Sequence, residues 1–222
     1  MPASVRSAEP QPVLLDVRDL TKTYVSGGGL FRRGRETAAM RGISFTLRRG
    51  EVLGLVGESG SGKSTLGRCI AGLLAQDSGQ VHLNGQAPNA RPATGRVQMV
   101  FQDPQASLNP RHTVGRSIMA GPIAQGMAPD KARARAAELL QLVGLNPDAA
   151  GRYPHEFSGG QRQRIGIARA LASEPDLIVA DEPVSALDVS VQAQVLDLFA
   201  SVRERFHLSM LFVTHDLSLI HI

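Results

Sequence analysis

The sequence predicts an α/β fold in which a mostly parallel sheet forms the core and a block of helices is inserted into it. Short apolar runs at residues 52–56, 97–101, 177–180 and 210–213 have the composition of buried strands. Helical patterns separate several of these runs, and strands that alternate with helices favour parallel pairing. Residues 103–172 instead show a helical pattern throughout, which predicts the inserted block.

The composition is that of an ordinary globular protein of 222 residues, long enough for one domain or for a core with a smaller subdomain. The single Cys69 excludes a disulfide framework and a cysteine metal cluster, and favours a reducing compartment. Residues 1–13 are too polar for a signal peptide, and no apolar run approaches the ~18 residues of a membrane span. The net charge of +4 is spread along the chain and aromatic residues make up 4%, so a nucleic-acid partner is not supported.

The N-terminal part is predicted to contain two strands, at residues 13–20 and 43–47, before the strand at 52–56. Tyr24 follows the first strand and could stack on a nucleotide base, although a tyrosine at a strand end is more often a packing residue. Residues 26–35 form a loop by composition, and its basic cluster is either a solvated hairpin tip or a contact for a partner or lipid headgroups.

Residues 57–65 fit the pattern G-x-x-x-x-G-K-[ST] directly after an apolar strand and before a helix expected at 65–74. Glycines let successive backbone N–H groups point into one concavity that can hold phosphate oxygens. Lys63 would bridge the β- and γ-phosphates and Ser64 would offer its hydroxyl to Mg²⁺. The alternative is a plain glycine-rich turn. The residues predicted to bind ATP here are Gly57, Ser59, Gly60, Gly62, Lys63, Ser64 and Thr65.

Beyond this helix, residues 77–80 are predicted to form a turn and residues 81–83 a short strand that Asn84-Gly85 closes as a hairpin. Residues 86–96 contain two prolines and are expected to be a loop, after which the strand at 97–101 ends at Gln102.

In the helical block, residues 132–143 predict a helix that begins near Pro129-Asp130. One face of it carries Ala136, Leu139, Leu140 and Val143. A second long helix is expected at 189–206, between the last two apolar strands.

Asp181 and Glu182 follow the strand at 177–180, at the carboxyl edge where a parallel sheet presents its functional groups. Asp181 can hold Mg²⁺, and Glu182 can orient and deprotonate the water that attacks the γ-phosphate. Acidic pairs after strands also occur as helix caps, and Pro183 suits a turn. Gln102 and His215 each follow a strand as well, and each is either a surface or structural residue or a group that contacts the Mg²⁺, the water or the γ-phosphate.

A second glycine-rich helix start occurs at Phe157-Ser158-Gly159-Gly160-Gln161. Ser158 is placed as an N-cap, and the two glycines leave backbone N–H groups uncovered, so this helix end can also bind an anion. Two phosphate sites far apart in one chain suggest that the second faces the nucleotide of another subunit.

In this order the motifs resemble the nucleotide-binding domain of ATP-binding cassette (ABC) transporters, over residues 14–217. The matching segments are 57–65 (Walker A), Gln102 (Q-loop), 158–161 (signature), Asp181-Glu182 (Walker B and catalytic glutamate), 185–188 (D-loop) and His215 (switch histidine). The resemblance implies a P-loop NTPase fold with a parallel core sheet, an N-terminal antiparallel β-subdomain and an inserted helical subdomain. It also implies binding and hydrolysis of ATP with Mg²⁺, and gives Tyr24 the place of the aromatic that stacks on adenine.

Within that family, residues 101–111 and 153–164 are similar to importers of dipeptides, oligopeptides, glutathione or nickel, and residues 29–33 look like the second of the two ATPases that such systems often encode. The resemblance implies a head-to-tail dimer with a second ATPase subunit, two membrane permease subunits and, indirectly, a solute-binding protein, at the cytoplasmic face of the bacterial inner membrane. The alternatives are a soluble ABC ATPase not coupled to transport and an inactive truncated remnant.

The expected organisation is a disordered start at 1–12, a β-subdomain and core at 13–102 and 173–217, a helical subdomain at 103–172 and an atypical tail at 218–222. The family usually continues well past the switch histidine, so the sequence suggests a C-terminal truncation. We expect the 222-residue chain alone to be poorly soluble or weakly active, because a missing sheet edge would expose apolar surface.

Overall fold

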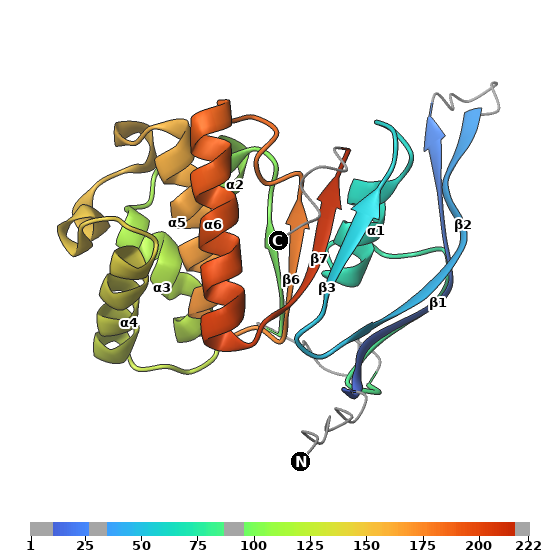
Figure 1. The fold of residues 1–222 in the computed structure, drawn as a ribbon, viewed down its shortest axis with the longest axis horizontal. Helices are drawn as coiled ribbons and strands as arrows, with labels where there is room; N and C mark the ends of the chain where they lie inside the picture. Colours follow the sequence, from blue (N-terminus) through green and yellow to red (C-terminus); the bar gives the residue numbers. More distant parts are fainter. Residues whose placement is uncertain (1–10, 27–34, 87–95, 216–222) are drawn as a thin grey trace, which may run out of the picture.

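The computed structural model describes residues 11–26, 35–86 and 96–215. Two sheets and a group of helices are arranged side by side (Figure 1). The four-stranded sheet lies between the helical block that includes α3 to α6 and the three-stranded sheet, and α1 lies between the two sheets. The expectations for the terminus at 1–12, the loops at 26–35 and 86–96 and the tail at 218–222 fall almost entirely outside the described residues. The division into domains stays a prediction.

The three-stranded sheet is antiparallel and has the order β2-β1-β4. Its strands are β1 (Val13–Ser26), β2 (Arg35–Arg48) and β4 (Ser78–Leu83). The two N-terminal strands are thus longer than the sequence pattern suggested, because their backbone pairing continues past the alternating apolar segments. The predicted turn at residues 77–80 is wrong for Ser78, Gly79 and Gln80, which belong to β4; Ser78 and Gln80 pair with β1, and the register shifts between them.

The four-stranded sheet is parallel, as predicted, and has the order β3-β7-β6-β5. Its strands are β3 (Val52–Val56), β5 (Val97–Val100), β6 (Leu177–Asp181) and β7 (Ser209–Thr214). The expectation that β3 is buried is wrong. Its five residues are only half-buried, because β3 is an edge strand among the residues that the structure describes.

The helices are α1 (Lys63–Ile70), α2 (Pro104–Ser107), α3 (Val114–Ala124), α4 (Pro129–Leu142), α5 (Gly159–Ala172) and α6 (Val189–Phe206), with short 3₁₀ turns at Pro147–Gly151 and Pro154–Glu156. The helix expected at 65–74 ends earlier, at Ile70. Gly72 has a φ of +70°, and its N–H and that of Leu73 bond back to the carbonyls of Cys69 and Arg68. This left-handed glycine turn terminates the helix.

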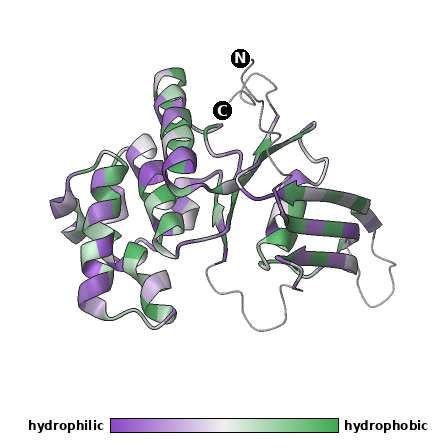
Figure 2. Ribbon diagram, turned by 60° about the horizontal axis from the view of Figure 1, so that its bottom comes forward, coloured by the Kyte–Doolittle hydropathy of each residue, from purple (hydrophilic) through white to green (hydrophobic). Residues whose placement is uncertain are grey.

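Two hydrophobic cores cover opposite faces of the parallel sheet. Successive residues of a strand point to opposite faces, so Ile178 and Ala180 of β6 pack among the helices α3 to α6, whereas Leu177 and Val179 pack against α1 and the antiparallel sheet. Figure 2 shows the corresponding alternation of hydrophilic and hydrophobic bands along the strands of the antiparallel sheet. The fold therefore places α1 and α5 on different sides of one sheet.

Within the described residues, no helix combines the length and the hydropathy needed to cross a bilayer.

Candidate functional site

The phosphate-loop motif lies between β3 and α1. At position 62 only glycine fits, both in backbone conformation and in space. This residue has a φ of +92°, and a Cβ atom added to it would lie 2.1 Å from the carbonyl oxygen of Ala39 on β2. Gly60 also has a positive φ, of +82°, but a Cβ atom added to it would meet no atom of the described residues within 4 Å. The loop is thus held by the close approach of the antiparallel sheet, which the sequence motif alone does not reveal.

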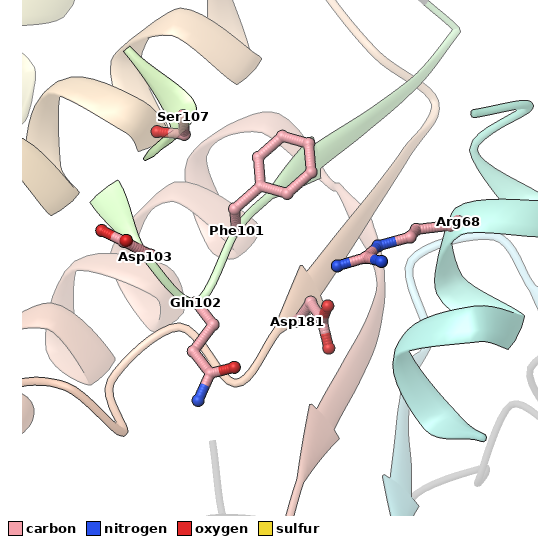
Figure 3. Close-up of a pocket in the computed structure, with 6 residues that line it drawn as sticks. All are labelled: Arg68, Phe101, Gln102, Asp103, Ser107 and Asp181. Carbon is pink, nitrogen blue, oxygen red and sulfur yellow. The ribbon is translucent and has the colours of Figure 1, made fainter. Parts of the chain in front are cut away.

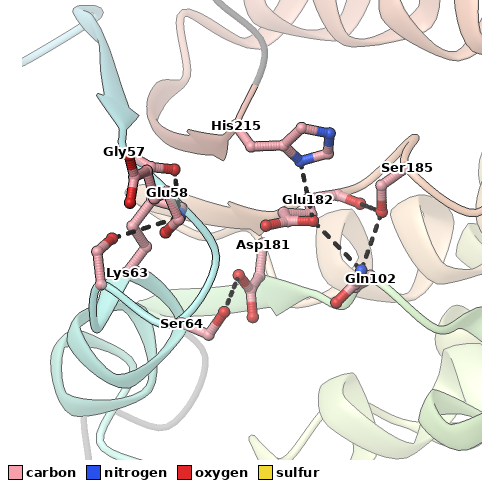
Figure 4. A network of polar contacts seen from close by, with 10 residues as sticks. Gly57, Glu58, Lys63, Ser64, Gln102, Asp181, Glu182, Ser185 and His215 are labelled. Carbon is pink, nitrogen blue, oxygen red and sulfur yellow. Dashed lines mark hydrogen bonds and ion pairs between the residues drawn. The ribbon is translucent and has the colours of Figure 1, made fainter. Parts of the chain in front are cut away.

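Lys63, the first residue of α1, is buried and its ammonium group is turned back onto its own loop. Its Nζ atom donates hydrogen bonds of 2.7 Å to the carbonyl oxygens of Gly57 and of Glu58 (Figure 4). An ammonium group has three donors and no acceptor. The charge is therefore held at the centre of the loop, where a phosphate group would meet it.

Asp181 ends β6 and is buried, and it accepts a 2.8 Å hydrogen bond from the hydroxyl of Ser64 on α1. Burial raises the pKa of Asp181 above its ordinary value, although the Ser64 hydroxyl and the charge of Arg68 oppose this shift. A buried carboxylate next to a hydroxyl is a pair of oxygen ligands suited to a hard cation. Nowhere in the described residues do three or more His, Cys, Asp or Glu side chains gather as a metal site, so a cation here would need further ligands from phosphate or water.

Glu182 follows directly, with a backbone in the left-handed region at φ +44°. Such a conformation is uncommon for a residue other than glycine and is concentrated at functional sites. Its carboxylate accepts a 3.2 Å hydrogen bond from the Gln102 amide and lies 3.3 Å from Nδ1 of His215 (Figure 4). Three strand ends, those of β5, β6 and β7, thus bring the predicted Gln102, Glu182 and His215 together.

Ser185 belongs to the same cluster, although it was not among the predicted site residues. Its hydroxyl accepts a 3.1 Å hydrogen bond from the Gln102 amide and donates a 3.0 Å hydrogen bond to the backbone carbonyl of Glu182. The serine lies in the 185–188 motif, which was the signal that could have identified it. It orients Gln102 and fixes the turn that carries Glu182.

Tyr24 lies close to the start of α1. Its hydroxyl is 3.4 Å from that of Thr65, and 42% of the residue's surface is exposed. An exposed ring beside the phosphate loop is free to stack on a flat ligand.

The second glycine-rich motif begins α5 as expected. Ser158 accepts a hydrogen bond from the backbone N–H of Gln161, whose side chain in turn accepts from the Ser158 N–H, forming a capping box. Gly160 has a packing reason as well, because a Cβ atom there would lie 2.4 Å from Cγ1 of Val191 on α6. Gly159 has more room, with Leu187 at 3.7 Å from an added Cβ.

The motif at Ser158, Gly159, Gly160 and Gln161 and the phosphate loop belong to different layers. The helix α5 is part of the core on one face of the parallel sheet and α1 is part of the core on the other. The fold thus gathers the predicted phosphate, metal and catalytic residues along the carboxyl edge of the parallel sheet and the start of α1, with Tyr24 on β1 beside Thr65. The Ser158 helix end belongs to the helical layer.

A pocket of about 380 Å³ adjoins the cluster, between α1 and the segment that follows β5 (Figure 3). It is lined by Arg68, Phe101, Gln102, Asp103, Ser107 and Asp181. Figure 3 shows Arg68 extending from α1 toward Asp181, across from the segment that follows Gln102. Arg68 was not predicted as a site residue, and no motif marks it.

The sequence profile of the family described as "ABC transporter" matches residues 40–185. The oligopeptide transport ATP-binding protein AppF of Bacillus subtilis strain 168 is 50% identical over 96% of this chain and 68% of its own length. A putative peptide import ATP-binding protein of Brucella ovis is 50% identical over 93% of this chain and 66% of its own. The glutathione import ATP-binding protein GsiA of Salmonella choleraesuis is 49% identical over 96% of this chain and 35% of its own. This chain therefore spans about two thirds of the length of the first two relatives.

Solved structures of ABC proteins also match this chain. The ATP-binding cassette MJ0796, solved as a dimer in a post-hydrolysis state with ADP and Pi, matches with a TM-score of 0.79 and 30% identity, over 93% of this chain and 90% of that one. The protein cbiO1 of Clostridium perfringens, part of the complex cbiONQ, matches with a TM-score of 0.76 and 25% identity, over 94% of this chain and 80% of its own. The chain therefore belongs to the ABC transporter family, and its fold is that of the family's ATP-binding cassette, an ATPase domain.

Proposed function

We propose that this chain is the ATP-hydrolysing subunit that energises an ABC importer for dipeptides, oligopeptides or a related small solute such as glutathione or nickel. The observation that carries the proposal is the cluster of Gln102, Glu182 and His215 beside the Ser64–Asp181 pair, at the edge of the sheet next to the phosphate loop. The names of the peptide-import and glutathione-import relatives support the solute class.

ATP binding would begin with an exchange of hydrogen bonds at Lys63. Its ammonium group now bonds to the carbonyls of Gly57 and Glu58, and the β- and γ-phosphates would become its new acceptors. The base would stack on Tyr24, and the N-terminal end of α1 would add its partial positive charge at the phosphates.

The Ser64 hydroxyl and the Asp181 carboxylate fit Mg²⁺, which would be held by these two groups and by Gln102. Bound there, the ion would neutralise phosphate charge. The raised pKa of Asp181 fits this role, because the buried carboxylate is poorly solvated until a cation is next to it.

For hydrolysis, Glu182 would orient and deprotonate the attacking water. Its carboxylate is already held by Gln102 and His215, so the water could occupy the space in front of a carboxylate whose direction is fixed. His215 is more exposed than Glu182, with 58% against 15% of the side-chain surface accessible, and it is free to turn toward the γ-phosphate.

The test of this chemistry is Glu182→Gln, which removes the base and keeps the shape. We expect ATP hydrolysis to fall by about 10²- to 10⁴-fold while ATP binding is retained. Turnover would be measured by phosphate release and binding by equilibrium dialysis. Wild-type turnover in the variant would remove Glu182 from this role.

A second copy of a cassette would complete the site. The glycine-rich start of α5 lies in a different layer from the phosphate loop, so its free N–H groups would serve the nucleotide of the opposite subunit. Val189, at the start of α6 just after the 185–188 motif, has 81% of its surface exposed, and a partner there would bury it.

The double variant Ser59→Cys, Ser158→Cys tests this head-to-tail arrangement. Both serines are exposed, whereas the native Cys69 is buried and would not interfere. We expect an intermolecular disulfide that forms with ATP and forms much less without it. Equal crosslinking in both conditions, or none, would contradict the shared site.

Two permease subunits would respond to the conformational change of the ATPase subunits, and a solute-binding protein would act indirectly through these permeases. The pocket beside Phe101, Gln102 and Asp103 adjoins the γ-phosphate end of the site and offers a surface for a permease segment. The chain would then work at the cytoplasmic face of the bacterial inner membrane as a peripheral subunit.

A further inference from the structure

The strand β1 is longer than β4, the strand that pairs with one of its two edges. β1 pairs with β4 only as far as Thr21, opposite Ser78, while on its other edge it pairs with β2 up to Ser26. Among the residues that the structure describes, the backbone N–H groups of β1 that lie beyond Thr21 on the β4 side therefore have no strand neighbour.

Asp77 replaces the missing strand at this point. Its backbone N–H donates to the Thr21 carbonyl at 3.0 Å, and its carboxylate accepts the Thr23 backbone N–H at 2.6 Å. The other carboxylate oxygen forms a 2.6 Å ion pair with the ammonium of Lys22. One residue thus holds three consecutive residues of β1. Consistent with this, the pKa of Asp77 is lowered, first by the Lys22 hydrogen bond and then by the Thr23 N–H.

The pairing of β1 with β2 is irregular before Thr23 and regular from Thr23 to Ser26, where Tyr24 lies opposite Thr37. The register between the two strands shifts between Leu20 and Lys22 and again between Lys22 and Thr23. Such irregularities bend a strand and leave its local position less determined by the ladder. Asp77 therefore holds the irregular segment at residues 21–23 from one edge of β1, while β2 holds Tyr24 from the other edge.

Asp77 also connects this backbone to the phosphate end of the site. It follows α1, the helix that begins at Lys63, and Tyr24 faces that helix through the 3.4 Å contact between its hydroxyl and that of Thr65. A bound nucleotide would meet both ends of this arrangement, with its phosphates at the start of α1 and its base at Tyr24.

We propose that Asp77 is a positioning residue for nucleotide binding: through Lys22 and the Thr23 N–H it sets the distance between the base-stacking Tyr24 and the phosphate loop. The inference rests on the proposed ATP-binding function. It predicts that losing the Asp77 carboxylate weakens the contribution of the base to binding and leaves the contribution of the phosphates unchanged.

The experiment compares a ligand that has a base with one that lacks it. Binding of AMP-PNP and of inorganic tripolyphosphate to the 222-residue chain is measured by calorimetry. We expect Tyr24→Ala to weaken AMP-PNP binding by about 5- to 100-fold, and Asp77→Ala to weaken it by about 3- to 10-fold. Tripolyphosphate binding should stay within about 2-fold in both variants, which also reports an intact phosphate loop.

The double variant Tyr24→Ala, Asp77→Ala decides whether Asp77 acts through the tyrosine. We expect it to bind AMP-PNP no more weakly than Tyr24→Ala alone. Asp77→Asn keeps an oxygen that can accept the Thr23 N–H, so it should recover most of the lost affinity. The matched control is Asp16→Ala, because Asp16 forms an ion pair with Arg18 on the same strand, remote from Tyr24, and should change neither ligand.

This inference would be overturned if the two substitutions weakened AMP-PNP binding additively. It would also be overturned if Asp77→Ala weakened the binding of both ligands equally, or left AMP-PNP binding unchanged. These results are separable from failure of the proposed function. If the wild-type chain failed to bind AMP-PNP at all, ATP binding itself would be refuted, and the inference with it.

Discussion

At the residue scale, the direction in which the pKa of a carboxylate shifts depends on its surroundings and not on its residue type. Asp181 and Asp188 are both aspartates near the carboxyl edge of the sheet, yet their pKa values shift in opposite directions. Burial raises the pKa of Asp181, whereas hydrogen bonds from the Ser190 hydroxyl and the Val191 N–H lower that of Asp188, which caps α6. The Asp181 carboxylate is placed to bind a cation, whereas the Asp188 carboxylate stabilises a helix.

This difference predicts the pH dependence of stability for Asp181→Asn without nucleotide. With its pKa raised above 3.8, Asp181 binds more protons in the folded than in the unfolded state, so its contribution to stability is lost as pH rises through the folded pKa. An asparagine can still accept from Ser64 but carries no charge. We expect the variant to be more stable than wild type at pH 7, with the difference shrinking as pH falls toward 3.8, measured by urea unfolding at several pH values.

Asp188→Asn is the control with the opposite sign. Its lowered pKa means that the carboxylate stabilises the fold above pH 3.8 and that this contribution is lost as pH falls through the folded pKa. This variant should therefore be less stable than wild type at pH 7. An Asp181→Asn variant that is also less stable at pH 7 would contradict the desolvation argument.

At the scale of elements, the start of α5 serves a binding and a packing purpose at the same positions. The capping box of Ser158 and Gln161 begins the helix and leaves the backbone N–H groups of Gly159 and Gly160 uncapped. Gly160 then lets α5 approach α6, since an added Cβ would lie 2.4 Å from Cγ1 of Val191. The glycines of the motif are thus not explained by phosphate binding alone.

We predict that Gly160→Ala destabilises the nucleotide-free protein by about 1–3 kcal/mol, because the added methyl group overpacks the contact between α5 and α6. Val191→Ala should restore part of this loss by removing the atom that clashes. The control is Gly166→Ala on the same helix, where an added Cβ atom meets nothing within 4 Å in the part of the chain that the structure describes. That change should raise stability by about 0.5–1 kcal/mol. Urea unfolding measures all three, and equal effects of the two glycine substitutions would refute the packing role.

At the scale of the whole molecule, α5 connects the helices to the strand ends that carry the site. The buried Gln163 amide donates to the Phe101 carbonyl at 3.4 Å, and the Arg169 guanidinium donates to the Ser107 carbonyl. These two acceptors flank Gln102. A movement of α5 would therefore be transmitted to the Gln102 segment through hydrogen bonds.

Arg169→Met tests this connection. Arg169 is largely buried, which lowers the pKa of its guanidinium, and its loss leaves the Ser107 carbonyl without this donor. We expect a destabilisation of about 1.5–3 kcal/mol and faster amide hydrogen exchange around residues 107–108. Arg133→Met is the control, because the ion pair of Arg133 with Asp130 is exposed and should contribute almost nothing. Unchanged exchange near Ser107 in Arg169→Met would contradict the coupling.

The sequence by itself determined the local chemistry and the kind of fold. The parallel sheet, the helix at Val189–Phe206, the Ser158 cap and the approach of Gln102, Glu182 and His215 all follow from short patterns, because apolar period, turn residues and strand ends are encoded locally. The same local patterns failed where pairing with a distant segment decided the outcome. Residues 78–80 belong to β4 beside β1 and not to a turn, and β3 is an edge strand among the described residues and only half-buried.

Only the tertiary structure decided what each of these residues touches. The carbonyls that hold Lys63, the Ala39 oxygen that requires Gly62, the Val191 methyl group against Gly160 and the Asp77 carboxylate on β1 involve backbone geometry or partners in other elements. Such contacts depend on how whole layers pack at distances of a few ångströms. A pattern of residue types along the chain carries no direct record of that packing, because many sequences with the same periodicity could fill the same space in different ways.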